Sequence, residues 1–191
     1  MPGAAAFEHS LPVLFVCFFF LFLSKFSLVQ VLILSLIALA LAAGPPSCAS
    51  SGKCCEINRL LRSAGFDATT SARLVATAWF ESSWGANKYG RKNSDGSQDF
   101  GLLQVNSYLA CSRSGNNRDC CCPGTYPACK KNPSRRTCAC LCGSSCENMV
   151  RSDSLNAQCA YRVFRSGCGG LRCWYGYSSN AATCNSYRVS C

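Results

Sequence analysis

The most informative stretch of this chain is residues 95–107, which read Asp95-Gly96-Ser97-Gln98-Asp99-Phe100-Gly101-Leu102-Leu103-Gln104-Val105-Asn106-Ser107. It continues the polar run 87–97, in which Asn93-Ser94-Asp95-Gly96 is a hairpin signal because Asn, Asp and Gly favour tight turns. Short strands are expected around this turn, and residues 102–105 are expected to begin a further strand or a short buried segment. The stretch therefore predicts a small antiparallel hairpin unit.

Helical patterns lie on both sides of this hairpin. From Cys55 onward apolar residues recur at helical spacing, and Gly65 follows as a stop signal. A second helix is predicted over about 71–84 and a third over about 154–165, where Leu155 belongs to the apolar face. Helices around one small hairpin block predict a mainly helical, disulfide-rich domain of the α+β class.

An apolar segment precedes this domain. Residues 11–43 contain one charged residue, Lys25, and end in small residues. These features predict an export signal over residues 1–43, whose removal leaves a domain of residues 44–191. Because the segment is long and a bilayer needs only about 20 apolar residues, an uncleaved membrane anchor is the alternative.

Cysteine is unusually abundant. Of the 18 cysteines, all but Cys17 follow residue 43, so an odd number remains in the exported part. Such density in an exported chain predicts a disulfide framework with at least one thiol free or paired between molecules. Zinc binding is the alternative, but Cys138-x-Cys140-x-Cys142 lacks zinc-finger spacing and no histidine follows residue 43. We expect no metal site.

The chain is strongly basic, with a formal net charge of +10. Such a surface attracts polyanions, which include nucleic acids, anionic membranes and acidic cell-wall polymers. The basic residues are scattered and are not interleaved with aromatic residues. The sequence therefore does not predict a nucleic-acid-binding module.

Glu81 lies near the end of the second predicted helix, in Ala78-Trp79-Phe80-Glu81-Ser82-Ser83-Trp84. Carbonyl groups at a helix C-terminus disfavour a negative charge, and aromatic neighbours exclude the water that would stabilise it. Both effects favour the protonated carboxyl group that a general acid requires. A single helical glutamate is more often a solvated surface residue, so this position alone does not identify a catalyst.

Asp99 follows the hairpin turn, where Asn93, Ser97 and Asn106 are candidate hydrogen-bond donors that would stabilise a carboxylate. Taken alone, Asp99 is better explained as an ordinary turn residue. Together with Glu81, it supplies the second of two carboxyl groups in opposite environments, which glycoside hydrolysis requires. One group protonates the leaving oxygen while the other supports the positive charge that develops on the sugar. We expect the two groups to face each other across an open cleft.

The combination of these residues is more specific than either alone. Trp79-Phe80-Glu81-Ser82 is followed, 18 residues after the glutamate, by Asp99 within residues 95–107. This pattern resembles the c-type (chicken-type) lysozymes, and the likeness continues through most of residues 55–191. It implies a lysozyme-like fold, interrupted by a Cys-rich insertion at about 112–141. The insertion contains Cys120, Cys121, Cys122, Cys129, Cys138 and Cys140.

The resemblance implies a secreted lysozyme. Such a glycoside hydrolase cuts the β-1,4 bonds between N-acetylmuramic acid and N-acetylglucosamine in bacterial peptidoglycan, for antibacterial defence or digestion. Glu81 would be the acid and Asp99 the nucleophile or charge stabiliser, while Trp174 matches the tryptophan that keeps the acid dry. The implied substrate-binding residues are Asn93, Gln104, Asn106, Tyr108 and Trp174. We expect a monomer without a cofactor that binds peptidoglycan and anionic cell surfaces, but no nucleic acid.

The family pattern also implies particular disulfide pairs, and this chain differs from the pattern at several positions. The implied pairs are Cys55–Cys191, Cys111–Cys146 and Cys142–Cys159, with Cys54 and Cys184 as alternative members of the first. Ala76 stands where the family has a cysteine, and Leu109 and Ala110 stand where aromatic sugar platforms are expected. An expected acidic residue is missing near Gly167, and Tyr177 replaces a tryptophan. These departures bear on substrate affinity more than on chemistry.

Three alternatives remain open at this point. A lytic transglycosylase shares the glutamate but does not need Asp99. A lactalbumin-like calcium binder needs an acidic cluster, whereas the region after Cys146 offers only Glu147 and Asp153. A non-catalytic cationic antimicrobial or gamete-binding protein is compatible with the basic surface.

Overall fold

The computed structural model describes Gln30 and residues 44–48, 52–114, 119–121, 129, 132, 134 and 137–191. The chain divides into two compact units, Met1–Gly44 and Pro45–Cys191, and the fold below is that of the second. The predicted signal segment lies almost entirely outside the described residues, so its cleavage stays a prediction. Among the residues that are described, no helix is both long and apolar enough to cross a membrane.

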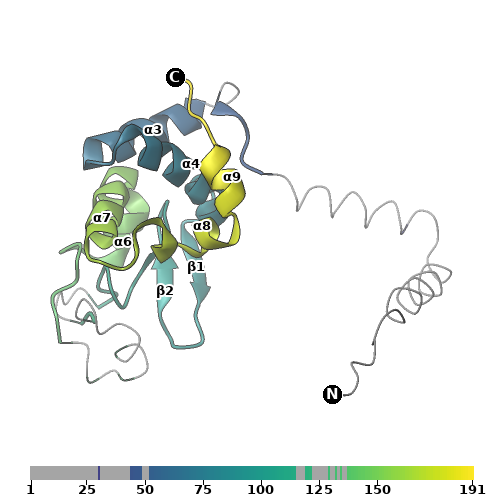
Figure 1. The fold of residues 1–191 in the computed structure, drawn as a ribbon. Helices are drawn as coiled ribbons and strands as arrows, with labels where there is room; N and C mark the ends of the chain where they lie inside the picture. Colours follow the sequence, from purple (N-terminus) through teal and green to yellow (C-terminus); the bar gives the residue numbers. More distant parts are fainter. Residues whose placement is uncertain are drawn as a thin grey trace, which may run out of the picture. The chain divides into compact units, whose positions relative to one another are not determined.

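The second unit combines helices with one small sheet, as Figure 1 shows. Its helices are α3 (Gly52–Ala64), α4 (Ala68–Ser82), α6 (Cys146–Arg151), α7 (Asp153–Arg165), the 3-10 helix η3 (Gly170–Cys173), α8 (Tyr175–Ser179) and α9 (Ala181–Ser186). Strands β1 (Tyr89–Lys92), β2 (Gln98–Phe100) and β3 (Val105–Asn106) form an antiparallel sheet in the order β1-β2-β3. The predicted α+β class with a small hairpin subdomain is confirmed.

Local signals explain where the first two helices begin and end. α4 begins at Ala68, three residues earlier than predicted, because Asp67 caps it by accepting a hydrogen bond from the Thr70 amide. α3 ends before Gly65, which adopts a φ of +113° that favours glycine. The amide of Gly65 donates back to the carbonyl of Arg62, which closes the last turn.

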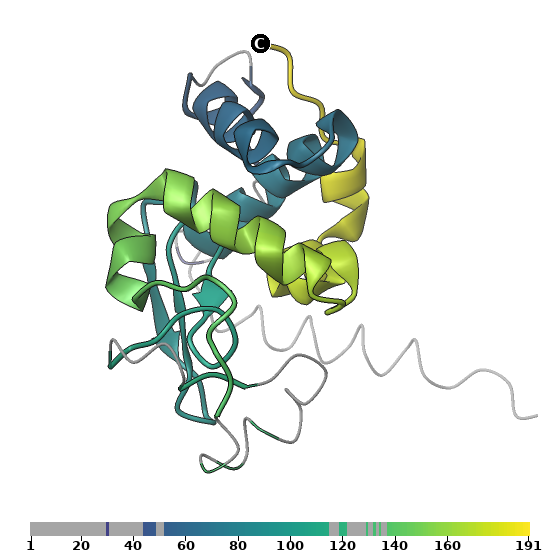
Figure 2. The same ribbon diagram turned by 90° about the vertical axis from the view of Figure 1, so that its left-hand side faces the viewer.

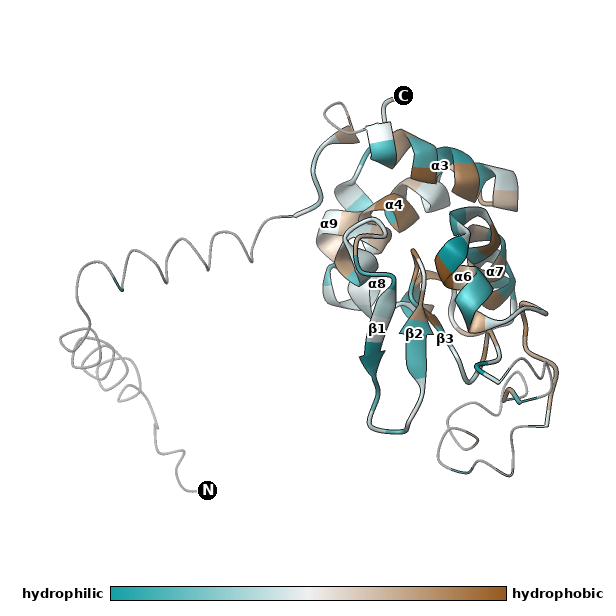
Figure 3. Cartoon of the chain, turned by 180° about the vertical axis from the view of Figure 1, so that it is seen from behind, coloured by the Kyte–Doolittle hydropathy of each residue, from teal (hydrophilic) through white to brown (hydrophobic). Residues whose placement is uncertain are grey.

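The core forms where the apolar faces of the helices meet. α3 packs against both α4 and α7, and Figure 2 shows α7 lying across this group of helices. The brown segments of α3 and α4 in Figure 3 contrast with the hydrophilic strand β1. Side chains that are fully buried in this core include Ile57, Leu61, Leu74, Val75 and Ala78.

The predicted apolar face of α7 is wrong at one position. Cys159 and Val163 are buried, but Leu155 is 39% exposed. Each step of four residues turns a helix by about 40° beyond a full circle. Leu155 is therefore rotated by about 80° from Val163, and it lies at the edge of the buried face.

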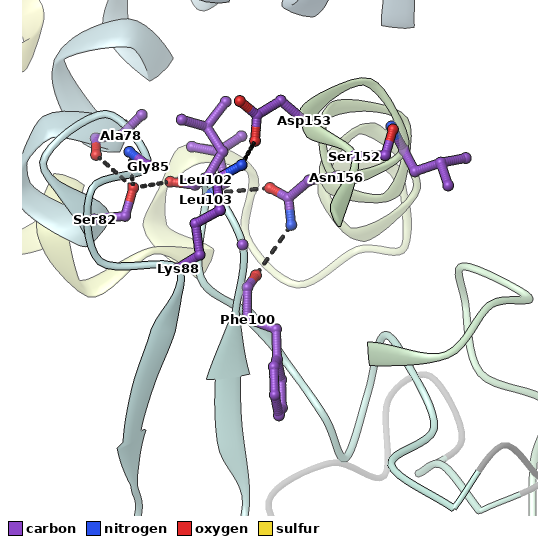
Figure 4. A network of polar contacts seen from close by, with 12 residues as sticks. Ala78, Ser82, Gly85, Lys88, Phe100, Leu102, Leu103, Ser152, Asp153 and Asn156 are labelled. Carbon is purple, nitrogen blue, oxygen red and sulfur yellow. Dashed lines mark hydrogen bonds and ion pairs between the residues drawn. The ribbon is translucent and has the colours of Figure 1, made fainter. Parts of the chain in front are cut away.

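The turn between β2 and β3 is fixed to two helices by buried polar groups (Figure 4). The fully buried Asn156 of α7 accepts a hydrogen bond from the Leu103 amide at 2.8 Å and donates to the Phe100 carbonyl at 3.0 Å. From α4, the Ser82 hydroxyl donates to the Leu102 carbonyl at 2.7 Å. A Cβ atom on Gly101 would lie 2.1 Å from the Asn156 amide nitrogen, so this approach requires glycine. The turn is therefore held rigidly beside the helices.

Disulfides link distant parts of this unit. The structure pairs Cys55 with Cys191, Cys111 with Cys146 and Cys142 with Cys159, which are the three pairs that the resemblance implied. Neither alternative member of the first pair is available, because Cys54 bonds to Cys48 and Cys184 is free and buried. Further bridges are Cys120–Cys140, Cys121–Cys129 and Cys168–Cys173. Cys122 lies outside the described residues.

Candidate active site

A cleft of about 360 Å³ contains both predicted carboxyl groups. The sheet wall of this cleft consists of Asp99, Gln104, Val105, Asn106 and Leu109. The helical wall consists of Cys168, Arg172, Cys173, Trp174 and Tyr175, which belong to η3 and the segments around it. Glu81 from α4 and Val163 from α7 complete the lining. The structure thus brings together residues that lie far apart in the sequence.

Glu81 is the penultimate residue of α4, where helix carbonyl groups disfavour a carboxylate. Burial raises the pKa of Glu81 from its ordinary value of 4.5 to about 7, and the nearby charge of Asp99 also raises it. The amide of Gly176 opposes this shift by donating a hydrogen bond to Oε1 at 2.7 Å. The net result is a carboxyl group that exchanges its proton near neutral pH, as a general acid should.

Gly176 is a residue of the candidate site that sequence reasoning missed. A Cβ atom at this position would lie 2.9 Å from Oε1 of Glu81, so a side chain would obstruct the hydrogen bond that orients the carboxyl group. The neighbouring Trp174 is 4% exposed, and its indole donates to the Leu103 carbonyl at 2.8 Å. The only signal in the sequence was that Gly176 lies two residues after Trp174.

Asp99 has the opposite environment. The side-chain amide of Asn106 donates to Oδ1 at 2.8 Å, and that of Asn93 donates to Oδ2 at 3.2 Å. Asn106 faces Asp99 directly across the β2–β3 ladder. Both side-chain oxygens of Asp99 therefore accept a hydrogen bond from an amide, which fixes the orientation of the carboxyl group.

Ser97 supports this arrangement without contacting the carboxylate, although it was a candidate donor to Asp99. Its hydroxyl oxygen accepts from the amides of Asn93 and Asn106, each at 3.0 Å, and its own proton goes to Asp95 at 2.6 Å. Ser97 therefore fixes the positions of the two asparagines that bind Asp99.

Gln104 lines the cleft, and its side chain connects two segments of the sheet region by hydrogen bonds. Its backbone has a φ of +46°, a left-handed conformation that is strained for a residue with a side chain. Its side-chain amide donates to the carbonyl of Gly101 at 2.8 Å and to that of Asn87 at 3.2 Å. These bonds connect the entrance of β1 to the β2–β3 turn, so Gln104 holds the strand that carries Asp99.

Two other positions differ from the expected arrangement. Tyr108 is not part of the cleft lining, because it lines a separate pocket and its hydroxyl donates to the Asp95 carbonyl at 3.1 Å. Ala110 is fully buried, whereas Leu109 lines the cleft. Among the described residues, the sheet wall of the cleft therefore contains no aromatic side chain. The exposed aromatic residue of the cleft is Tyr175 on the helical wall.

Comparison with known proteins agrees with this fold. No family model matches the chain. A lysozyme of Hyalophora cecropia is 28% identical over 127 residues, which cover 66% of this chain and 75% of that protein. Lysozyme C, milk isozyme, of Canis lupus familiaris is 35% identical over 71 residues, or 35% of this chain and 55% of that protein. Lysozyme B of Drosophila melanogaster is 35% identical over 77 residues, or 40% of this chain and 54% of that protein.

The fold, the paired carboxyl groups and these relatives define a lysozyme-type protein. The similarity includes both insect lysozymes and a mammalian lysozyme C, so the chain is similar to the c-type lysozymes. This confirms the resemblance that was found around Glu81 and Asp99. The relationship supports a glycoside hydrolase of the lysozyme type.

Proposed function

We propose that this protein is a muramidase that hydrolyses the β-1,4 bonds between N-acetylmuramic acid and N-acetylglucosamine in bacterial peptidoglycan. One observation carries the proposal. Burial raises the pKa of Glu81 to about 7, and in the same cleft the side-chain amides of two asparagines donate hydrogen bonds to Asp99. Glycoside hydrolysis needs one carboxyl group that keeps a proton and one that loses it. The role of the enzyme is antibacterial defence or digestion.

The first chemical step transfers the proton of Glu81 to the oxygen of the scissile bond. As the bond between the anomeric carbon and this oxygen breaks, the alcohol leaves and positive charge develops on the remaining sugar. The carboxylate of Asp99 neutralises this charge, either by electrostatic attraction or by bonding to the anomeric carbon. Because the Gly176 amide occupies Oε1 of Glu81, we assign the transferred proton to Oε2.

The second step restores the enzyme. Glu81, now a carboxylate, removes a proton from water, and the hydroxyl group bonds to the anomeric carbon as Asp99 is released. The buried Trp174 limits the access of other water to the acid. Both steps use the proton exchange of Glu81 near neutral pH.

The surroundings of Asp99 favour hydrolysis over lytic transglycosylation. A transglycosylase needs no second carboxylate, whereas here two asparagines and Ser97 are organised around Asp99. We therefore expect products with new reducing ends and not with anhydro sugars.

We further propose that the protein acts as a secreted monomer without a cofactor, after removal of residues 1–43. The seven disulfides among the described residues fit a protein that folds in an oxidising compartment. The net charge of +10 would draw it to anionic bacterial surfaces. Among the residues that the structure describes, no cluster of ligands is arranged for a metal ion.

The test is the clearing of purified bacterial cell walls, with chemical analysis of the released sugar ends. Wild-type protein should clear the suspension, and a folded Glu81→Gln variant should not. Glu56→Gln is the matched control, because Glu56 lies on α3 and pairs with Lys53 at the surface. Lysis by the Glu81→Gln variant would refute the proposal. Binding without lysis by the wild type would favour the non-catalytic alternative.

A further inference from the structure

The helical wall of the cleft carries two side chains that the reaction itself does not use. Arg172 is the one cation among the described residues that line the cleft, and none of the ion pairs formed within the described part of the chain includes it. Tyr175, three residues later, is 82% exposed. An unpaired guanidinium and an exposed aromatic ring on one wall suggest a ligand that supplies both an anion and a flat apolar face.

In the part of the chain that the structure describes, the opposite wall carries neither a cation nor an aromatic ring. The apolar side chains of the sheet wall are Val105 and Leu109, which are aliphatic, and Tyr108 lines another pocket. A sugar that enters this cleft therefore meets an aromatic face at Tyr175. The exposure of Tyr175 also means that binding would remove apolar surface from water, which favours association.

The segment that carries these residues is built to be rigid. The Cys168–Cys173 disulfide closes a short loop around η3, in which Gly169 and Gly170 have φ values of 109° and 66°. Immediately after the loop, Trp174 is anchored to the Leu103 carbonyl. Pre-organisation of this kind lowers the entropy that is lost when a ligand binds.

We propose that Arg172 and Tyr175 form a recognition site for the acidic, peptide-bearing strands of peptidoglycan, which makes the cleft selective for peptidoglycan over neutral chitin. Arg172 binds a carboxylate of the muramyl peptide, since a guanidinium can donate two parallel N–H bonds to a carboxylate. Tyr175 packs on a sugar ring, a contact that both polymers can make. The inference rests on the proposed function, because it deepens the substrate class of the same cleft.

The test measures binding in the Glu81→Gln background, in which hydrolysis is blocked. The probes are a soluble muropeptide with free carboxylates and the neutral oligosaccharide chitotetraose, and each dissociation constant is measured by calorimetry. Arg172→Gln should weaken muropeptide binding about tenfold and change chitotetraose binding less than about twofold. Arg172→Lys should have an intermediate effect. Tyr175→Ala should weaken the binding of both probes.

The matched control is Arg165→Gln, which removes the same charge from an exposed residue at the end of α7 that is not part of the cleft lining. Equal losses in Arg165→Gln and Arg172→Gln would show that only net charge matters, and would overturn the inference. So would equal losses for the two probes. If the wild type fails to clear cell walls but Arg172 remains selective, the proposed hydrolysis fails and the recognition site stands.

Discussion

The surroundings of Glu81 and of Asp99 differ although both carboxyl groups line one cleft. Glu81 sits at the end of an apolar helix with one backbone donor, whereas Asp99 sits on a sheet with two side-chain amide donors. Burial dominates at Glu81 and raises its pKa to about 7. The comparison shows that a helix end and a hairpin edge give two chemically similar groups opposite tasks.

The largest expected effect is the loss of the proton donor. Glu81→Gln keeps the side-chain oxygen that accepts from Gly176 but has no acidic proton. General acid catalysis contributes about 10²–10⁴-fold, so the rate of cell-wall hydrolysis should fall by about 10³-fold or more. Initial clearing rates at equal concentrations of folded protein measure this. A drop of less than tenfold would mean that Glu81 is not the acid.

Removing the charge of Asp99 should lower the hydrolysis rate somewhat less than removing the proton donor does, and it should also change the pH dependence of the activity. Asp99→Asn should lower the rate by about 10²–10³-fold, because it removes the charge that stabilises the cationic sugar. It should also lower the pKa of Glu81, since the charge of Asp99 helps to raise it. In the pH–activity profile of Asp99→Asn, the loss of activity on the alkaline side should therefore occur at lower pH than in the wild type. An unchanged profile would show that the two groups are not coupled.

The same burial that makes Glu81 an acid should reduce stability at high pH. Because its pKa is about 7 in the folded protein and its ordinary value is 4.5, the folded state holds this proton more tightly. This contribution to the free energy of unfolding is fully present below pH 4.5 and is lost as the pH rises through 7. Glu81→Gln should therefore be more stable than the wild type at pH 8, by on the order of 2–3 kcal/mol.

Urea unfolding of both proteins at pH 4 and pH 8 checks this expectation. The difference between them should nearly vanish at pH 4, where the wild-type carboxyl group is protonated in both states. A difference that is equal at both pH values would have a cause other than the ionisation of Glu81.

The two amides that bind Asp99 should contribute unequally. Asn106 donates at 2.8 Å from a partly buried strand position, whereas Asn93 donates at 3.2 Å from an exposed turn. Since hydrogen bonds to charged groups contribute about 1.5–3 kcal/mol, Asn106→Ala should lower the hydrolysis rate about tenfold or more. Asn93→Ala should lower it only a few-fold. The reverse order, measured on the same peptidoglycan, would contradict the geometry.

Local patterns were enough to predict the elements that hold the two carboxyl groups. The helical period and the hairpin signal placed Glu81 at a helix end and Asp99 beside a turn, because both depend on residues close in sequence. The short helices α6, α8 and α9 gave no usable period, since a helix of five or six residues contains less than two turns.

Contacts between distant residues could not be predicted in the same way. Gly176 lies 95 residues from Glu81, and its role depends on the closure of the whole domain. The resemblance implied that Tyr108 binds substrate, but its hydroxyl donates to the Asp95 carbonyl and the residue lines another pocket. The exposure of Tyr175 is likewise a tertiary property, which its position beside Trp174 did not reveal.

The most direct test of this account is the titration of the Glu81 side chain by carbon NMR, with the Glu81→Gln variant used to assign its signal. The account predicts a midpoint near pH 7 in the folded wild-type protein, because burial dominates over the single hydrogen bond from Gly176. A midpoint at or below about 4.5, the ordinary value for glutamate, would mean that Glu81 is ionised at neutral pH. It could then not serve as the proton donor, and the division of tasks between the two carboxyl groups would be wrong.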